Sequence, residues 1–308
     1  MENVLLLGGT GFIGSNIIKY LKKERYKIFV LELPGKIHDT NDDVTFFYGK
    51  LEQIELVKKI VVDNSINIVM HLASSLIPSS DIDAYLNEFE IIIKPTITLL
   101  PFFAKSNVRF IFFSSGGTVY GTNKSGIFSE SSKTNPISYY GHSKLILEES
   151  ILLEGRISNL NYLIIRPSNP YGVGQNIFGK QGLIAASIGH LLNGEKISIW
   201  GDGTVVRDYI NIEDLAKGVV GIIENVDNNQ IFNIGSGKGY SVNEIIDILK
   251  KCSVADFEVE YLEGRPVDVP VMILNVKKFC DIVGDTKICI EDGIKNFYNY
   301  EISKMKNK

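Results

Sequence analysis

Residues 3–16 have the sequence NVLLLGGTGFIGSN, in which an apolar run of strand length leads directly into glycines at positions 8, 11 and 14. A helix-length segment, residues 15–23, follows. In such a turn Gly8 permits a sharp reversal, Gly11 lets the backbone approach a pyrophosphate, and Gly14 lets the helix pack closely on the sheet. The first N–H groups of the helix and its positive dipole end would then face the phosphates. The pattern predicts a dinucleotide-binding turn. A glycine-rich turn alone, however, also occurs as a simple connection between two elements that binds no ligand.

Apolar runs of strand length alternate with helix-length segments along the first half of the chain. Several of these runs are apolar throughout, which is typical of parallel strands that are covered on both faces. The alternation predicts an α/β chain with a Rossmann-type, doubly wound parallel sheet. The expected strands are residues 4–7, 28–31, 44–48, 66–72, 110–114 and 162–165, and the expected helices are residues 15–23, 53–62 and 84–106.

The second expected strand ends at Glu32, 18 residues after Gly14. An acidic side chain at this place accepts hydrogen bonds from the adenosine ribose and would repel a 2′-phosphate. We therefore predict NAD as the cofactor in preference to NADP. Lys36 is the one nearby residue that could soften this preference, and a surface glutamate without a ligand is the alternative interpretation of Glu32.

Tyr140 and Lys144 are four residues apart, which on a helix places them on one face about one turn from each other. A free tyrosine titrates near pH 10, too high for a base at neutral pH. A neighbouring lysine cation and an oxidised nicotinamide would both stabilise the phenolate and lower the pKa of Tyr140. The spacing also arises by chance, so it gains weight only beside the dinucleotide-binding turn.

With these two features the chain resembles the extended short-chain dehydrogenase/reductase family, specifically its nucleotide-sugar epimerase branch. The resemblance covers nearly the whole length and rests on ordered motifs at family spacing. They are Gly8…Gly11…Gly14, His71-Leu72-Ala73, SSGGTVYG at 114–121, Tyr140…Lys144, RPSNPYG at 166–172, GDG at 201–203, RDY at 207–209, NIG at 233–235 and RPVD at 265–268.

The resemblance implies a role for each matching residue. Tyr140 would be the acid and base at the sugar 4-hydroxyl, and Lys144 would bind the nicotinamide ribose and help to keep Tyr140 ionised. The substrate-binding residues would be Asn169 at the sugar-nucleotide, Arg207 and Arg265 at its diphosphate, and Asp268 at the nucleotide ribose. Besides Tyr140 and Lys144, the implied cofactor-binding residues are Gly8, Gly11, Phe12, Ile13, Gly14, Glu32, Leu51, Leu72, Ala73 and Pro167.

The chain departs from its relatives where the family places a catalytic Ser or Thr, because that position is Gly116 here. In an extended segment, side chains two residues apart share a face. We therefore expect Thr118 to supply the missing hydroxyl, with Ser115 as the second candidate, and loss of both hydroxyl and activity as the alternative. Gly117 and Thr118 also occupy the positions where the related 4,6-dehydratases carry Asp-Glu, which disfavours dehydration.

The resemblance therefore implies an NAD-dependent nucleotide-sugar 4-epimerase that oxidises and re-reduces C4, with a UDP-hexose as the favoured substrate. A nucleotide-4-keto-sugar reductase, or another nucleotide-sugar-modifying oxidoreductase of the family, is the alternative. A regulator that only senses a dinucleotide is disfavoured because Tyr140 and Lys144 are both present. The expected division is a cofactor-binding domain at 1–168, with segments near 207–236 returning to it, and a smaller α+β, mainly substrate-binding region at 169–308.

Composition limits the partners of the chain. The net charge of −4 comes without a basic stripe, which disfavours nucleic acid, and no apolar run approaches the roughly 18 residues of a membrane span. The three cysteines lack metal-ligand spacing, so we expect no metal and a cytoplasmic location. The family resemblance implies a homodimer through segments 84–105 and 140–155, where Leu145, Ile146 and Ile151 could face a partner or cover the sheet.

Overall fold

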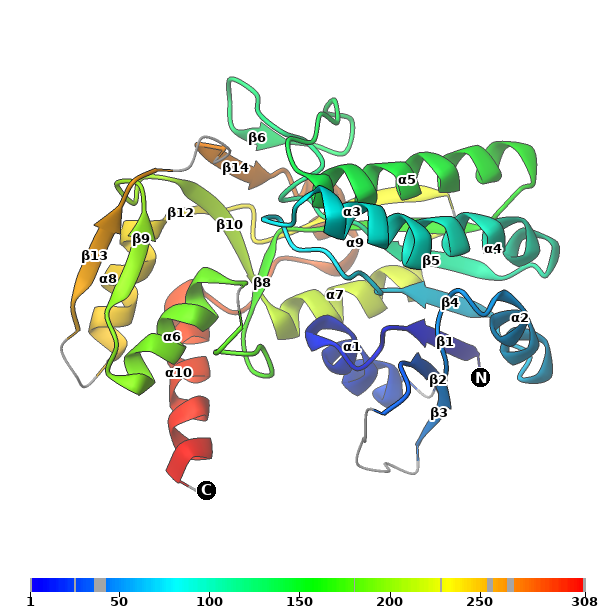
Figure 1. Ribbon diagram of the computed structural model, residues 1–308, viewed down its shortest axis with the longest axis horizontal. Helices are drawn as coiled ribbons and strands as arrows, with labels where there is room; N and C mark the ends of the chain where they lie inside the picture. Colours follow the sequence, from blue (N-terminus) through cyan, green and yellow to red (C-terminus); the bar gives the residue numbers. More distant parts are fainter. Residues whose placement is uncertain are drawn as a thin grey trace.

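The computed structural model of the chain describes residues 2–24, 26–35, 43–179, 181–227, 229–253, 257–264 and 269–306. In this part of the chain a parallel sheet of seven strands forms the larger half of the molecule (Figure 1). Its strand order is β11-β7-β5-β4-β1-β2-β3. The bounds are β1 (Asn3–Leu7), β2 (Lys27–Glu32), β3 (Val44–Tyr48), β4 (Ile68–His71), β5 (Arg109–Phe113), β7 (Tyr162–Pro167) and β11 (Gln230–Ile234).

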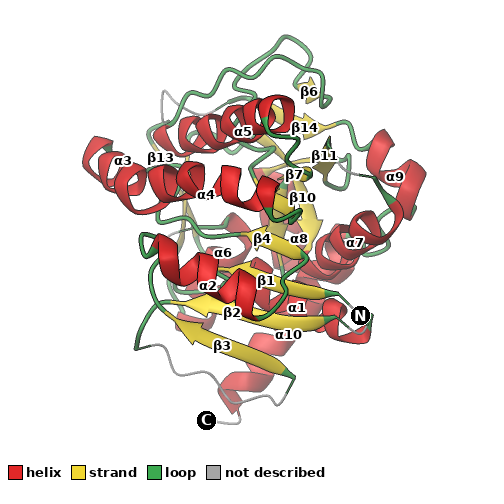
Figure 2. Cartoon of the chain, turned by 90° about the vertical axis from the view of Figure 1, so that its right-hand side faces the viewer, coloured by secondary structure: helices red, strands yellow, loops and turns green. Residues whose placement is uncertain are grey.

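Helices cover both faces of this sheet, as Figure 2 shows from the side. Alternate side chains of β1 enter opposite cores, because Leu6 packs with one set of helices and Leu5 and Leu7 pack with the other. This arrangement confirms the predicted doubly wound α/β fold. The first set is α1 (Phe12–Lys23), α7 (Ile212–Asn225) and α9 (Lys277–Val283), and the second is α2 (Ile54–Asp63), α4 (Lys94–Lys105) and α5 (Tyr139–Ile157).

The expected single helix at 84–106 has an irregular middle. It consists of α3 (Ile82–Glu88), a π-helical turn η1 (Phe89–Ile93) and α4. Pro95 has no N–H to donate, and its ring would crowd the carbonyl four residues earlier in a regular helix. A turn with wider hydrogen bonding just before the proline avoids that clash. The prediction of one regular helix was therefore wrong in its middle.

A second, smaller region packs beside the carboxyl ends of the large sheet and is built mainly from chain after residue 168 (Figure 1). A capping box formed by Ser241 and Glu244 begins its helix α8 (Val242–Cys252). Most of the short strands of this second region were not predicted. The elements are β6 (Ile127–Phe128), β8 (Asn169–Tyr171), β9 (Ile197–Trp200), β10 (Val206–Asn211), β12 (Gly239–Ser241), β13 (Val259–Leu262), β14 (Val271–Leu274), α6 (Leu183–Asn193), α8 (Val242–Cys252) and α10 (Ile290–Lys306).

The two regions are joined by chain that passes between them several times. After β7 the chain leaves the large sheet through β8, and after β10 it returns through α7 to β11, which pairs with β7 at the sheet edge. Functional side chains on β8 and β10 are thereby held against the carboxyl ends of the large sheet. Among the described residues, no helix has both the length and the apolar character required to cross a bilayer.

Candidate active site

A cleft of about 650 Å³ lies where the carboxyl ends of β1, β4, β5 and β7 face the second region. In open parallel sheets this edge is where ligands bind. One wall is the turn from Gly8 to Gly14, and the opposite wall includes Trp200 and Arg207 of the second region. Of the residues predicted from the sequence, those lining the cleft are Gly8, Gly11, Phe12, Ile13, Gly14, Leu72, Ser115, Thr118, Tyr140, Lys144, Pro167, Asn169 and Arg207.

The glycine turn brings backbone close to backbone at the floor of the cleft. Gly8 has φ +80°, and a Cβ there would lie 3.0 Å from the backbone N and Cα of Ala73. A Cβ on Gly14 would lie 2.5 Å from the carbonyl oxygen of Gly9. Helix α1 begins after Gly11 without any side-chain cap, so its first N–H groups are left for a ligand. This cradle fits the pyrophosphate of the predicted dinucleotide.

Glu32 lies beside the turn without lining the cleft. Its buried carboxylate accepts hydrogen bonds from the Thr10 hydroxyl and from the backbone N–H of Leu33, the latter at 2.9 Å. The contact with Thr10 ties the end of β2 to the glycine turn. Leu51 is buried in the core against the second helix set, and Lys36 lies outside the described residues.

Hydroxyl groups at the floor of the cleft have no hydrogen-bond partner within the described part of the chain. They belong to Ser114, Thr118 and Ser168. A buried hydroxyl without a partner is costly, and such groups in a cleft indicate a polar ligand. The residues present therefore fit a polar dinucleotide or sugar better than an apolar molecule.

Tyr140 lies in the first turn of α5, where Ser138 caps the helix by accepting the N–H of Gly141. A Cβ on Gly141 would lie 2.6 Å from the carbonyl oxygen of Thr118, so glycine permits α5 to approach the 115–118 segment closely. This approach brings the Tyr140 phenol to the Ser115 hydroxyl, with which it forms a hydrogen bond. A tyrosine and a serine from distant parts of the sequence thus meet inside the cleft.

The expectation of an extended segment at 115–118 is wrong. The N–H groups of Thr118 and Val119 bond back to the carbonyl oxygen of Ser115, at 3.3 and 3.2 Å, so the segment is a turn. Residues 115 and 118 therefore do not follow the alternation of a strand. Ser115 meets Tyr140, whereas the Thr118 hydroxyl is buried without a partner among the described residues.

The glycine at 116 has a steric cause. A Cβ there would lie 2.6 Å from Cδ1 of Leu274 and 2.9 Å from the carbonyl oxygen of Arg166. Leu274 comes from β14 of the second region and is 1% exposed, so it has little room to move. Packing between the two regions therefore leaves no room for a hydroxyl-bearing side chain at position 116.

Burial sets the pKa values of the two predicted catalytic groups. Desolvation in the cleft raises the pKa of Tyr140 to about 12, opposed by the hydrogen bond from Ser115 and assisted by the charge of Glu88. Burial also lowers the pKa of Lys144 to about 8, opposed by the charges of Glu88 and Glu148. We expected the lysine to lower the pKa of the tyrosine, but in this structure desolvation dominates and the shift has the opposite sign.

Lys144 is 4% exposed and lies over the rings of Phe112 and Tyr140, with Nζ 5.3 and 5.6 Å from their centroids. His71 lies nearby at the end of β4, and its Nε2 is 2.8 Å from the Thr96 hydroxyl. Burial, assisted by the Lys144 charge, lowers the pKa of His71 to about 3, so this imidazole is neutral. The lysine therefore carries the positive charge at the floor of the cleft.

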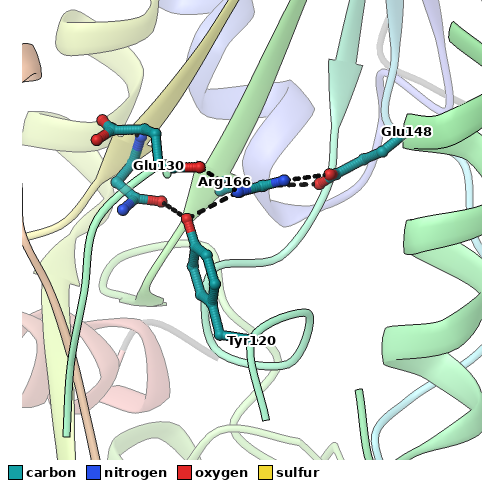
Figure 3. A network of polar contacts seen from close by, with 5 residues as sticks. Tyr120, Glu130, Glu148 and Arg166 are labelled. Atoms are coloured by element: carbon teal, nitrogen blue, oxygen red, sulfur yellow. Dashed lines mark hydrogen bonds and ion pairs between the residues drawn. The ribbon is translucent and has the colours of Figure 1, made fainter. Parts of the chain in front are cut away.

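A buried polar network fixes α5 one turn after Lys144, as Figure 3 shows. The Arg166 guanidinium, on β7, donates two hydrogen bonds to Glu148, at 2.9 and 2.5 Å, and one to the Tyr120 hydroxyl at 2.9 Å. Tyr120 in turn donates to the side-chain oxygen of Asn233 at 2.6 Å. Glu148 is one turn after Lys144, so the network holds the catalytic helix against the sheet. Lys144 and Glu148 are four residues apart in the sequence, but nothing in the sequence indicated that Arg166 would pair with Glu148.

Two of the residues predicted to bind the substrate line the cleft, namely Asn169 on β8 and Arg207 on β10. The Asn169 amide donates to the carbonyl oxygen of Asp208 at 2.8 Å, and Arg207 donates to the carbonyl oxygens of Val206 and Val269 at 2.9 and 2.5 Å. These bonds orient both side chains at the cleft wall. The remaining predicted substrate residues, Arg265 and Asp268, lie outside the described residues.

Comparison with known proteins assigns the chain to a family. Residues 4–235 match the model of the NAD dependent epimerase/dehydratase family. A putative UDP-glucose 4-epimerase of Methanocaldococcus jannaschii is 32% identical over 96% of this chain and 97% of its own length. A dTDP-4-dehydro-6-deoxyglucose reductase of Escherichia coli is 28% identical over 95% of each.

Among solved structures, the UDP-glucose 4-epimerase of Thermotoga maritima with UDP-glucose superposes with a TM-score of 0.92. It is 30% identical, and the match covers 98% of this chain and 99% of that one. The similarity therefore includes both the large sheet and the smaller region that together form the cleft. A family match over most of the sequence, on this shared architecture, shows that the chain belongs to the NAD dependent epimerase/dehydratase family.

Proposed function

We propose that this chain is a nucleotide-sugar 4-epimerase that uses NAD and acts on a hexose linked to UDP. The observation that carries the proposal is the position of Tyr140. Its phenol, hydrogen-bonded to Ser115, lies in one cleft between the glycine turn and Arg207. This position supports a role for Tyr140 in proton transfer, with the glycine turn as the site for the dinucleotide and Arg207 as the cation for the diphosphate.

The chain's own groups divide the proton chemistry between them. When bound, NAD would accept the hydride that leaves C4 of the sugar and would return it, so that no net oxidation occurs. Tyr140 takes the proton of the 4-hydroxyl as C4 is oxidised and gives it back as C4 is reduced. Ser115 holds the reacting oxygen and the phenol in register, while Lys144 stabilises the phenolate.

Inversion requires the 4-keto sugar to present its other face before it is reduced. We assign the tether that retains it to Arg207, which holds the diphosphate while the hexose turns. Asn169, fixed to the Asp208 carbonyl oxygen, contacts the sugar-nucleotide. In this scheme Arg265 and Asp268 keep their predicted roles at the diphosphate and the nucleotide ribose.

A reductase of nucleotide-4-keto-sugars is the second candidate, and the Escherichia coli relative favours it because the two chains match over 95% of both lengths. The same Tyr140 would then deliver a proton to the 4-keto oxygen. The reactions differ in stoichiometry, since a reductase consumes one reduced cofactor per turnover and an epimerase consumes none.

The test is incubation of the protein with NAD and a panel of nucleotide sugars, followed by chromatography of the products. We expect a UDP-hexose to equilibrate with its C4 epimer while the nicotinamide absorbance stays constant. Stoichiometric oxidation of NADH on addition of a 4-keto sugar, without epimerisation of any panel member, would establish the reductase instead. Absence of both reactions would refute the proposed function.

We also propose that the protein is a homodimer through α3, α4 and α5. Large apolar side chains are exposed on this side, among them Leu86, Phe89, Leu153 and Ile157. Ile151, one of the predicted interface residues, is instead fully buried against the sheet. Sedimentation or light scattering should give twice the chain mass, and a monomeric mass at micromolar concentration would reject the dimer.

A further inference from the structure

Glu88 is a carboxylate buried beside the catalytic helix. It is the last residue of α3, directly before the π-helical turn η1, and only 1% of it is exposed. Helix α3 packs on α5, which carries Tyr140 and Lys144. Single π-helical turns are common at functional sites because they redirect the side chains around them. A buried glutamate at such a turn requires a physical reason, since burying a charge is costly.

Among the described residues, the polar contacts of the Glu88 carboxylate come from Ser74 and Ser75, which follow β4. It accepts the Ser74 hydroxyl at 2.9 Å, the Ser75 N–H at 2.7 Å and the Ser75 hydroxyl at 2.5 Å. All three partners are donors, which suits an ionised carboxylate. Ser74 lines the cleft, so these bonds fix part of the cleft wall to the end of α3.

No lysine, arginine or histidine among the described residues forms an ion pair with Glu88. The other carboxylate that acts on Lys144 is Glu148, and its charge is already engaged by Arg166. His71, on the sheet side of Lys144, is neutral at working pH. Glu88 is therefore the buried negative charge near the catalytic pair that lacks a cation of its own.

We infer that Glu88 is a positioning residue: its charge sets the pH range in which Tyr140 and Lys144 work, and its hydrogen bonds hold Ser74 of the cleft wall together with its neighbour Ser75. The inference rests on the proposed function of this pair. Glu88 itself touches neither the predicted cofactor turn nor Arg207. It acts through its field on α5 and through the two serines.

The sign of the charge effect follows from electrostatics. A negative charge disfavours the tyrosine phenolate and favours the lysine ammonium, so Glu88 raises the pKa of both groups. Activity needs Tyr140 able to accept a proton and Lys144 protonated. Removing the charge in Glu88→Gln should therefore move both the acidic and the alkaline limb of the pH–rate profile to lower pH, by roughly 0.5 to 1 unit each.

The experiment compares kcat and KM against pH for the wild type, Glu88→Gln and the matched control Glu90→Gln, all saturated with NAD. Glu90 is two residues away, but it is exposed and pairs with Lys94 at the surface. We expect both limbs to shift in Glu88→Gln and neither to shift in Glu90→Gln. A Glu88→Gln enzyme with a lower maximum and unmoved limbs would overturn the inference, because a merely structural role predicts that result.

Two further variants separate charge from hydrogen bonding. Glu88→Asp keeps the charge and shortens the side chain, so its limbs should stay within about 0.3 unit of the wild type. Ser75→Ala keeps the Glu88 charge and removes one donor, so it should raise KM without moving the limbs. If both limbs of the pH–rate profile moved as far in Glu88→Asp as is expected for Glu88→Gln, the assignment would be contradicted. These variants keep the inference testable if Glu88→Gln does not fold.

A readout without substrate distinguishes failure of this inference from failure of the proposed function. Phenolate absorbance is measured against pH for four proteins: the wild type, Tyr140→Phe, Glu88→Gln and the double variant Glu88→Gln/Tyr140→Phe. Subtracting the Tyr140→Phe curve from the wild-type curve gives the titration of Tyr140 with Glu88 present. Subtracting the double-variant curve from the Glu88→Gln curve gives the titration of Tyr140 without the Glu88 charge. The Tyr140 transition should move to lower pH in the second difference. An unmoved transition overturns the inference even if the enzyme epimerises sugars, whereas a moved transition in a protein without epimerase activity leaves only the proposed function refuted.

Discussion

The two walls of the cleft differ in the groups they present to a ligand: one presents backbone atoms and the other presents side chains. On the cofactor side the groups that face the ligand are backbone atoms, presented by Gly8 at φ +80° and by the uncapped start of α1. On the substrate side they are side chains such as Asn169 and Arg207, which are held by hydrogen bonds to carbonyl oxygens of neighbouring strands. A wall made of backbone requires glycines at fixed spacing, whereas a wall made of side chains depends on the packing of strands distant in sequence.

Helix α5 carries Tyr140, and removal of the Tyr140 hydroxyl should have the largest effect on turnover. Tyr140→Phe keeps the ring and removes the group that exchanges the proton, so kcat should fall by roughly 10³-fold. NAD affinity should change by less than about threefold, since neither wall is altered. Turnover by chromatography and cofactor binding by fluorescence titration measure the two quantities. A variant that keeps a tenth of the wild-type kcat would remove Tyr140 from the proton transfer.

The substrate wall is tested at Arg207. Arg207→Met removes the cation while retaining an unbranched stem, and it should raise KM for the nucleotide sugar by about 10- to 100-fold, the cost of a lost charge-assisted contact. The affinity for NAD should stay unchanged. An equal loss of NAD and sugar affinity would mean that the walls are not independent.

The junction between the walls is tested at the two hydroxyls near Tyr140. Ser115→Ala removes the hydrogen bond to the phenol and should lower kcat by about tenfold. Thr118→Val should change kcat by less than about threefold, because its hydroxyl does not contact the phenol. Parallel kcat measurements with both variants decide between the residues, and a larger loss in Thr118→Val would restore our sequence-based order of preference.

The smallest effect is expected from the backbone wall, when only one methyl group is added. Gly8→Ala should weaken NAD binding by about five- to tenfold, because the new Cβ presses on Ala73 and shifts the turn. Gly35→Ala is the matched control, since Gly35 has φ +90° with nothing within 4 Å of its Cβ position. Both variants should lose about 1 kcal/mol of stability from the positive φ. Only Gly8→Ala should lose cofactor affinity in a binding titration, and equal affinities would show that crowding at Ala73 is unimportant.

Six of the seven strands of the large sheet were predicted, because most of them are short apolar runs that are buried on both faces; β11, which mixes polar with apolar residues, was not predicted. The second region was much less predictable, since β8 and β10 are short and mix polar with apolar residues. Glu88 and Glu148 showed no pattern of their own, because an acidic residue on a helix is ordinarily at the surface. Their burial depends on what packs against α3 and α5.

Three features follow from local sequence: the glycine turn, the order of the strands and helices near it, and the position of Tyr140 one helical turn before Lys144. These features are local, since spacing and side-chain type fix them before any distant contact forms. Three others depend on packing: Ser115 rather than Thr118 meets Tyr140, Leu274 occupies the space that a side chain at position 116 would need, and burial raises the pKa of the phenol. Each of these depends on segments far apart in the chain, whose approach depends on the packing of the whole molecule.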